Sequence, residues 1–89
     1  MHETALVRDV VHRMVELTQS AGACRVSGAR IWLGALSHLS PEHFRDHFSV
    51  EAQGTVAAGA VLTIEMSDDP NDPHAQLVRL ESIDLDDDE

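Results

Sequence analysis

The chain has no lysine in 89 residues. Schiff-base chemistry and phosphate-binding loops need a lysine, so the aldolase, pyridoxal-dependent and P-loop NTPase classes are excluded. A single cysteine, Cys24, excludes an intramolecular disulfide. No apolar run approaches the ~20 residues of a membrane span, and no basic segment followed by a hydrophobic stretch opens the chain. We therefore expect a cytoplasmic protein without a secretory signal.

Familiar enzyme motifs are also missing. There is no Gly-x-Ser-x-Gly elbow, no glycine-rich dinucleotide loop and no convincing pair of catalytic carboxylates. We expect a protein that is not an enzyme and that binds no organic cofactor.

Basic residues are few: six arginines oppose 16 acids, for a formal net charge of −10. This charge repels phosphate backbones and anionic lipids, so we expect neither nucleic-acid nor membrane binding. Residues 1–64 hold six acids and five arginines, whereas residues 65–89 hold ten acids and one arginine. The sequence therefore predicts two different surfaces on one small domain, which we place at residues 1–85, with an acidic tail at 86–89.

Hydropathy patterns predict two helices and three strands. Helical spacing and an N-cap at Ser40 indicate the helices, and alternation indicates the strands. The predicted order is helix 4–21, strand 25–36, a helix beginning at Ser40, strand 60–66 and strand 76–85. Gly28 marks a bulge, because Val26 is out of phase with the strand. We expect an α+β fold with both helices on one face of a three-stranded sheet, in which the short connection 67–75 makes the last two strands an antiparallel pair.

Three separated pieces of the sequence resemble the HypA family of hydrogenase and urease nickel-incorporation proteins. They are Met1-His2-Glu3, then Leu33-Gly34-Ala35-Leu36-Ser37 with Pro41-Glu42 and Gly54-Thr55, and finally Val78-Arg79-Leu80-Glu81-Ser82-Ile83. The resemblance implies a nickel metallochaperone that acts in maturation of a nickel enzyme, NiFe hydrogenase foremost. It also implies a maturation GTPase or the hydrogenase large subunit as partners.

The chemistry of the first three residues suits Ni²⁺. The amine of Met1, the backbone nitrogens of His2 and Glu3 and the imidazole of His2 offer four nitrogen donors near one plane. This set suits square-planar Ni²⁺ or Cu²⁺, whereas Zn²⁺ prefers a tetrahedral one. The Glu3 carboxylate supplies a ligand in a six-coordinate alternative.

The sequence departs from the family where relatives carry a zinc module with two Cys-x-x-Cys pairs, between the last two strands. Here that place holds residues 67–75, and no Cys-x-x-Cys occurs. We expect no structural zinc. His38 and His74 are weaker candidate nickel ligands, for which a solvated loop histidine is the alternative.

A few other residues leave alternatives open. His43 and His47 lie four residues apart on a predicted helix. They either bind a metal as a pair or lie on an exposed face of that helix. Trp32 falls on the open side of the sheet, where its indole either forms part of a protein contact surface or packs under the acidic tail. A second hypothesis is therefore a metal-free adaptor or structural subunit that binds a protein partner, and an open sheet edge allows a homodimer.

Overall fold

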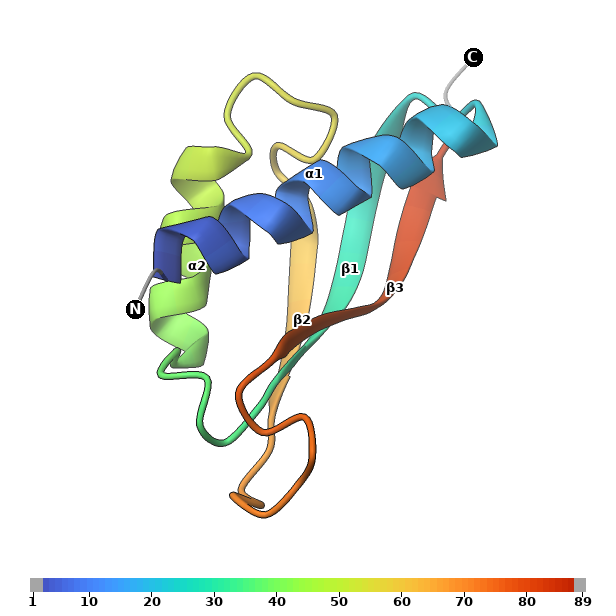
Figure 1. Ribbon diagram of the computed structural model, residues 1–89. Helices are drawn as coiled ribbons and strands as arrows, with labels where there is room; N and C mark the ends of the chain where they lie inside the picture. Colours follow the sequence, from blue (N-terminus) through green and yellow to red (C-terminus); the bar gives the residue numbers. More distant parts are fainter. Residues whose placement is uncertain (1–2, 88–89) are drawn as a thin grey trace.

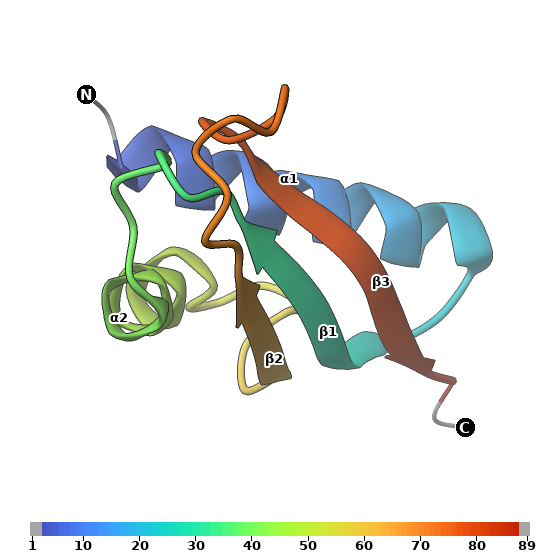
Figure 2. The same ribbon diagram turned by 90° about the horizontal axis from the view of Figure 1, so that it is seen from below.

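Two helices and three strands make up residues 3–87, the part of the chain that this computed structural model describes (Figure 1). The elements are α1 (Glu3–Ala21), β1 (Arg25–Leu33), α2 (Pro41–Glu51), β2 (Val61–Met66) and β3 (Val78–Asp86). The predicted α+β class and element order are confirmed. In Figures 1 and 2, α1 lies across the sheet along β1 and β3, and α2 lies beside β2.

Local sequence explains both helices. In α1, buried Val7, Val10, Val11 and Met14 recur at spacings of three, one and three along one face. In α2, Pro41 opens the helix and the Ser40 hydroxyl accepts a hydrogen bond from the backbone N–H of His43 at 3.1 Å. Neither helix in residues 3–87 is long and apolar enough to cross a bilayer.

The strand order is β2-β1-β3, which corrects the expected pairing of β2 with β3. β1 lies between them, parallel to β2 and antiparallel to β3. The two outer strands therefore run in opposite directions but are not neighbours. The physical reason is that α2 already provides the connection that parallel strands β1 and β2 require, which leaves the other edge of β1 for β3.

The segment between β2 and β3, residues 67–77, is therefore a crossover and not a hairpin. It passes the end of β1, where Leu33 is opposite both Met66 and Val78. Ser67 donates its backbone N–H to the Leu33 carbonyl at 2.9 Å, which continues the pairing of β1 with β2.

Beyond β1 the chain also bonds to the crossover. The Gly34 N–H donates to the Leu77 carbonyl at 2.9 Å, and the Leu36 N–H donates to the Ala75 carbonyl at 2.7 Å. The predicted strand to Leu36 thus ends at Leu33, because Gly34 begins a turn held by these bonds. A Cβ at Gly34 would lie 2.2 Å from the Ala75 carbonyl oxygen, so this close approach requires glycine.

The inner face of the sheet carries the core. Val26, Ala29, Ile31 and Leu33 of β1 are buried against the helices, with Phe44 and Phe48 of α2 stacked at 6.2 Å between ring centroids. The register shifts between Val26 and Gly28, which confirms the bulge predicted near Gly28.

β3 continues to Asp86, one residue past the expected domain boundary. The Asp86 carbonyl accepts from the Cys24 N–H at 2.9 Å, and its carboxylate lies 2.6 Å from the Arg25 guanidinium. Asp86 thus pairs with the start of β1, whereas residues 88–89 of the expected acidic tail lie outside the described residues.

Candidate functional site

The predicted nickel terminus falls at the start of α1. Met1, His2 and the side chain of Glu3 lie outside the described residues, so their arrangement stays a prediction. The helix itself begins at Glu3. The first N–H groups of an α-helix have no acceptor within the helix, so the backbone nitrogen of Glu3 is not used by α1. It remains available as one of the four predicted nitrogen donors.

A hollow of about 190 Å³ lies beside the first turns of α1. It is lined by Leu6, by Leu36, Ser37 and His38 of the loop after β1, and by Gln76 of the crossover. Ser37 is 2% exposed, and its hydroxyl has no hydrogen-bond partner among the described residues. Elements far apart in the sequence therefore meet beside the start of α1.

His38, the first of the weaker candidate ligands, lines this hollow. Its side chain is exposed, and its backbone has a φ of 64°, the only positive φ of a non-glycine residue within residues 3–87. Left-handed backbone in a non-glycine residue is strained and often occurs at functional sites. The structure thus brings His38 near the first turns of α1, which sequence spacing could not show.

His74, the second weaker candidate, lies in the crossover. Its backbone N–H donates to the Asp72 carboxylate at 2.7 Å, and its Nδ1 lies 3.6 Å from the same carboxylate. His43 and His47 lie on α2. Among the described residues, no three His, Cys, Asp or Glu side chains come together as a possible metal site. The structure therefore does not assemble these histidines into a metal centre of their own.

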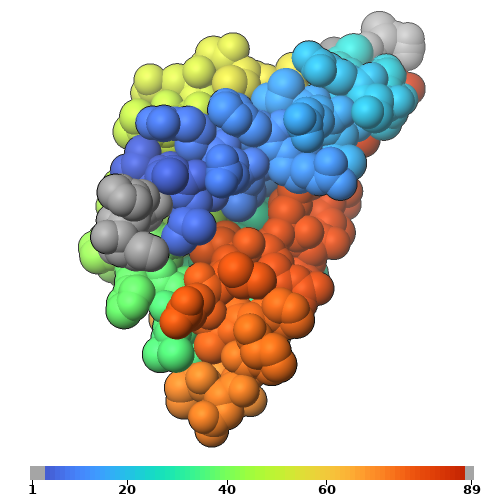
Figure 3. All heavy atoms as spheres, in the orientation of Figure 1, coloured from blue at the N-terminus to red at the C-terminus, as the bar shows by residue number. Residues whose placement is uncertain are grey.

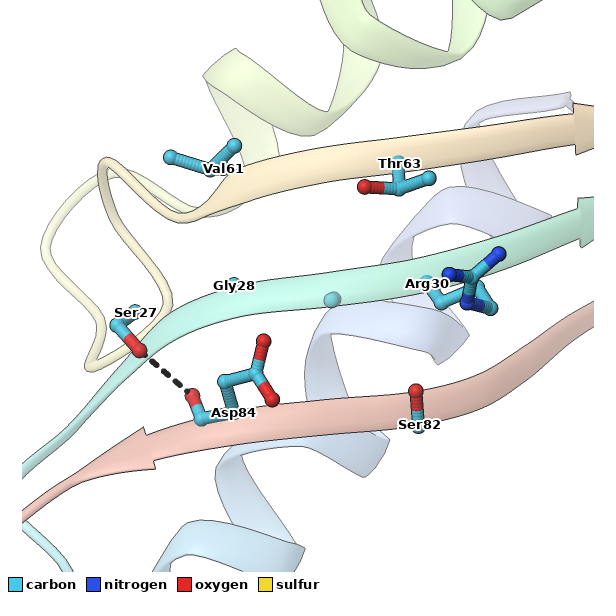
Figure 4. Close-up of a pocket in the computed structure, with 8 residues that line it drawn as sticks. Ser27, Gly28, Arg30, Val61, Thr63, Ser82 and Asp84 are labelled. Atoms are coloured by element: carbon cyan, nitrogen blue, oxygen red, sulfur yellow. Dashed lines mark hydrogen bonds between the residues drawn. The ribbon is translucent and has the colours of Figure 1, made fainter.

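The outer face of the sheet carries a second, polar groove of about 270 Å³ (Figure 4). Register places Thr63, Arg30 and Ser82 in one row across the three strands. At the edge of the groove the Ser27 hydroxyl donates to the backbone carbonyl of Asp84 at 3.1 Å. With a single carboxylate in its lining, this groove offers few ligands for a divalent metal.

Trp32 belongs to this outer face, because it alternates with buried Ile31 and Leu33. The indole is half-buried, and the Arg79 guanidinium carbon lies 5.8 Å from the ring centroid. This cation–π contact covers part of the indole. Trp32 is opposite Arg79 at the start of β3, so it does not pack under the described C-terminal residues, which lie at the far end of that strand.

An ion pair joins the two helices. Arg8 of α1 lies 3.1 Å from the Glu51 carboxylate at the end of α2. The hydrogen bond from Arg8 to Glu51 and the attraction of the two charges raise the pKa of Arg8 above its ordinary value. Arg8 therefore keeps its charge at any physiological pH.

This combination of a three-stranded mixed sheet and two helices defines a known class of small α+β domain. It is similar to the solution structure of the Ni metallochaperone HypA from Helicobacter pylori, with a TM-score of 0.82 at 17% identity, over 99% of this chain and 100% of that one. A second solution structure of a HypA protein aligns with a TM-score of 0.71 at 19% identity, over 96% of each chain. At these identities the likeness shows the fold.

The sequence itself is matched by the family described as hydrogenase/urease nickel incorporation, metallochaperone, HypA, over residues 1–69. This chain belongs to the HypA family. It is 39% identical over 64 residues to hydrogenase maturation factor HypA 1 of Bradyrhizobium diazoefficiens, and 38% identical over 66 residues to HypA of Methylocella silvestris. These alignments cover 72% and 74% of this chain but 57% and 58% of the relatives, so the match extends over little more than half their length.

Proposed function

We propose that this chain is a nickel-binding metallochaperone of the HypA type that serves maturation of a nickel enzyme, with NiFe hydrogenase as the foremost target. Membership of the family is the observation that carries the proposal, because the matched segment begins at residue 1 and includes Met1-His2-Glu3. The curated relatives carry the name hydrogenase maturation factor, which favours hydrogenase over urease. The cargo of this chain is Ni²⁺, and its protein partners are a maturation GTPase, the hydrogenase large subunit, or both.

The proposed metal site uses the Met1 amine, the backbone nitrogens of His2 and Glu3, and the His2 imidazole. The start of α1 at Glu3 supports this set, because the helix leaves that backbone nitrogen without an internal acceptor. A planar set of nitrogen donors matches the geometry that Ni²⁺ accepts and Zn²⁺ does not favour.

His38 is the better placed of the two additional candidate ligands. It lines the hollow beside Leu6, one turn after Glu3, whereas His74 contacts Asp72 in the crossover. An α-helix rises ~1.5 Å per residue, so Leu6 lies only ~4.5 Å along the axis from Glu3. We propose that His38 acts as a supplementary ligand and that His74 does not bind the metal.

Calorimetric nickel titration of the untagged full chain tests the site. We expect binding with a stoichiometry near one, and loss of most affinity in His2→Ala because the imidazole is one of four donors. His12→Ala is the matched control, because His12 is exposed on α1 and away from the terminus. An N-terminal tag that blocks the Met1 amine should abolish binding as well.

Variants of the individual histidines show which of them bind nickel. His38→Ala should weaken nickel binding less than His2→Ala, and His74→Ala should leave it unchanged. If His2→Ala binds nickel as tightly as the parent chain, the terminal site is wrong. If the parent chain binds no nickel at all, the metal-free adaptor becomes the better description.

A further inference from the structure

The crossover forms the narrow end of the molecule (Figure 3). A third hollow, a groove of about 400 Å³, lies on it. Its apolar lining comes from Leu36 of the loop after β1 and from Pro70, Pro73 and Leu77 of the crossover. Leu36 and Leu77 are 39% and 46% exposed, and they are two of the five large hydrophobic residues exposed among residues 3–87. We call this groove the crossover surface. Two exposed leucines that share one concave surface are typical of a contact site.

The crossover surface has a fixed shape. Side chains of the crossover bond to its own backbone: the Asp69 carboxylate accepts from the Asn71 N–H at 2.9 Å, and the Asp72 carboxylate accepts from the His74 N–H at 2.7 Å. The Leu77 N–H donates to the His74 carbonyl at 2.9 Å. These turns hold the groove open in one conformation, so a partner that binds it orders little of the chain.

Charge determines what kind of partner fits. Residues 67–77 contain Asp68, Asp69 and Asp72 and no arginine, within the C-terminal part that carries most of the negative charge. Asp72 lies in the lining of the groove itself. A groove that exposes leucine side chains beside Asp72, on an acidic crossover, attracts a segment that carries an apolar side chain flanked by arginine or lysine, and it repels an acidic one.

The crossover surface continues into the hollow beside α1. Leu36 and Gln76 line both, and Leu6 of the first turns of α1 lines the hollow. The backbone nitrogen of Glu3 belongs to the same end of α1, ~4.5 Å along the helix axis from Leu6. A protein seated on the crossover surface therefore lies beside the first turns of α1, where the proposed nickel-binding sequence ends.

We propose that the crossover surface is the docking site for the protein that receives or delivers the nickel, and that this protein binds through a basic segment with an apolar anchor. The inference rests on the proposed function for its biological meaning, but the contact it describes is separate from the metal. The anchor occupies the groove between Leu36 and Leu77, and basic residues of the partner face Asp68, Asp69 and Asp72.

Binding measurements with purified proteins test this inference. The untagged full chain is titrated separately with the maturation GTPase and with the hydrogenase large subunit of the same organism, each labelled with a fluorophore, and anisotropy is recorded. We expect one of them to bind the parent chain, and Leu36→Asp and Leu77→Asp each to weaken that binding about tenfold or more, since a central apolar anchor dominates such contacts. Val61→Asp is the matched control, because Val61 is 72% exposed on the outer face at the other end of β2.

A second set of variants tests the charge. A triple variant combines Asp68→Asn, Asp69→Asn and Asp72→Asn. It keeps the side-chain oxygen atoms that accept the turn hydrogen bonds but removes three negative charges. We expect weaker binding at low salt and a smaller loss of affinity when salt is raised. Circular dichroism of every variant checks that the fold is retained. If a leucine variant unfolds, the triple asparagine variant still tests the crossover surface.

Nickel titration of the same proteins separates this inference from the proposed function. Leu77→Asp and the triple asparagine variant leave the lining of the hollow beside His38 unchanged, so both should bind nickel like the parent chain. His2→Ala should lose nickel and keep partner binding measured without metal. The inference is overturned if neither protein binds the parent chain, if the leucine variants bind as well as the parent, or if Val61→Asp weakens binding equally. A parent chain that binds its partner but binds no nickel would instead overturn the nickel site alone.

Discussion

Replacement of Gly34 by alanine tests how the crossover is held. A Cβ at this position would lie 2.2 Å from the carbonyl oxygen and 2.5 Å from the carbonyl carbon of Ala75, and 2.8 Å from the carbonyl oxygen of His74. All three atoms belong to the backbone, so no side chain can rotate away. The crossover must therefore move by more than ~1 Å to reach ordinary van der Waals separation.

The cost of that movement follows from the contacts it breaks. The bonds from the Gly34 N–H to Leu77 and from the Leu36 N–H to Ala75 would be lost or stretched, at about 1 kcal/mol each. Ala75, which is buried, would become partly exposed. We expect Gly34→Ala to lower the free energy of unfolding by about 2–3 kcal/mol, a large share of the ~5–15 kcal/mol typical of a native domain.

Urea denaturation followed by circular dichroism measures this loss. Gly22→Ala is the control, because Gly22 has a φ of 70° but no atom within 4 Å of an added Cβ. That variant carries only the backbone cost of a left-handed alanine, about 1 kcal/mol. The reasoning is refuted if Gly34→Ala is no less stable than Gly22→Ala. If it is correct, Gly34→Ala should also weaken partner binding at the crossover surface while nickel binding is unchanged.

Two further predictions concern the cap of α2 and the metal. Ser40→Ala should lower the free energy of unfolding by about 1 kcal/mol, because the His43 N–H loses its acceptor. Ser40→Asp should keep most of the parent stability, because aspartate also caps helices. Thermal unfolding of the parent chain and the two variants measures both effects. Nickel affinity should fall as the pH is lowered through about 6.5, because imidazole binds metal only when neutral and the amine must also lose its proton. Titrations at pH 5.5, 6.5 and 7.5 that give equal affinities would contradict the nitrogen-donor site.

Local features of the fold were predictable from the sequence. Apolar spacing identified α1, the Ser40-Pro41-Glu42 sequence identified the start of α2, and alternation placed the inner face of β1. Strand order was not predictable in the same way, because hydropathy identifies strands without stating which edges meet. The short predicted connection 67–75 suggested a hairpin, but β1 lies between the two strands that this segment joins.

The candidate site was predictable only in part. The nickel terminus came from Met1-His2-Glu3 and from the resemblance, and it stays a prediction because those positions fall outside the described side chains. No sequence pattern places Leu6, Leu36 and Gln76 together, because these residues belong to three distant segments. The close contact of Gly34 with Ala75 was equally hidden, since glycine after a strand is compatible with an ordinary turn.

The central position of β1 has a consequence for how this fold tolerates changes in length. Met66 and Val78 are both opposite Leu33, one on each side of β1, so neighbouring-strand spacing sets them about 10 Å apart. Their separation does not depend on how many residues connect them, and the entropy of closing a loop rises only slowly with its length. A short acidic segment or an entire folded module can therefore be exchanged between these two points while the rest of the domain keeps its register, which makes the junction a natural position for grafting new binding specificities.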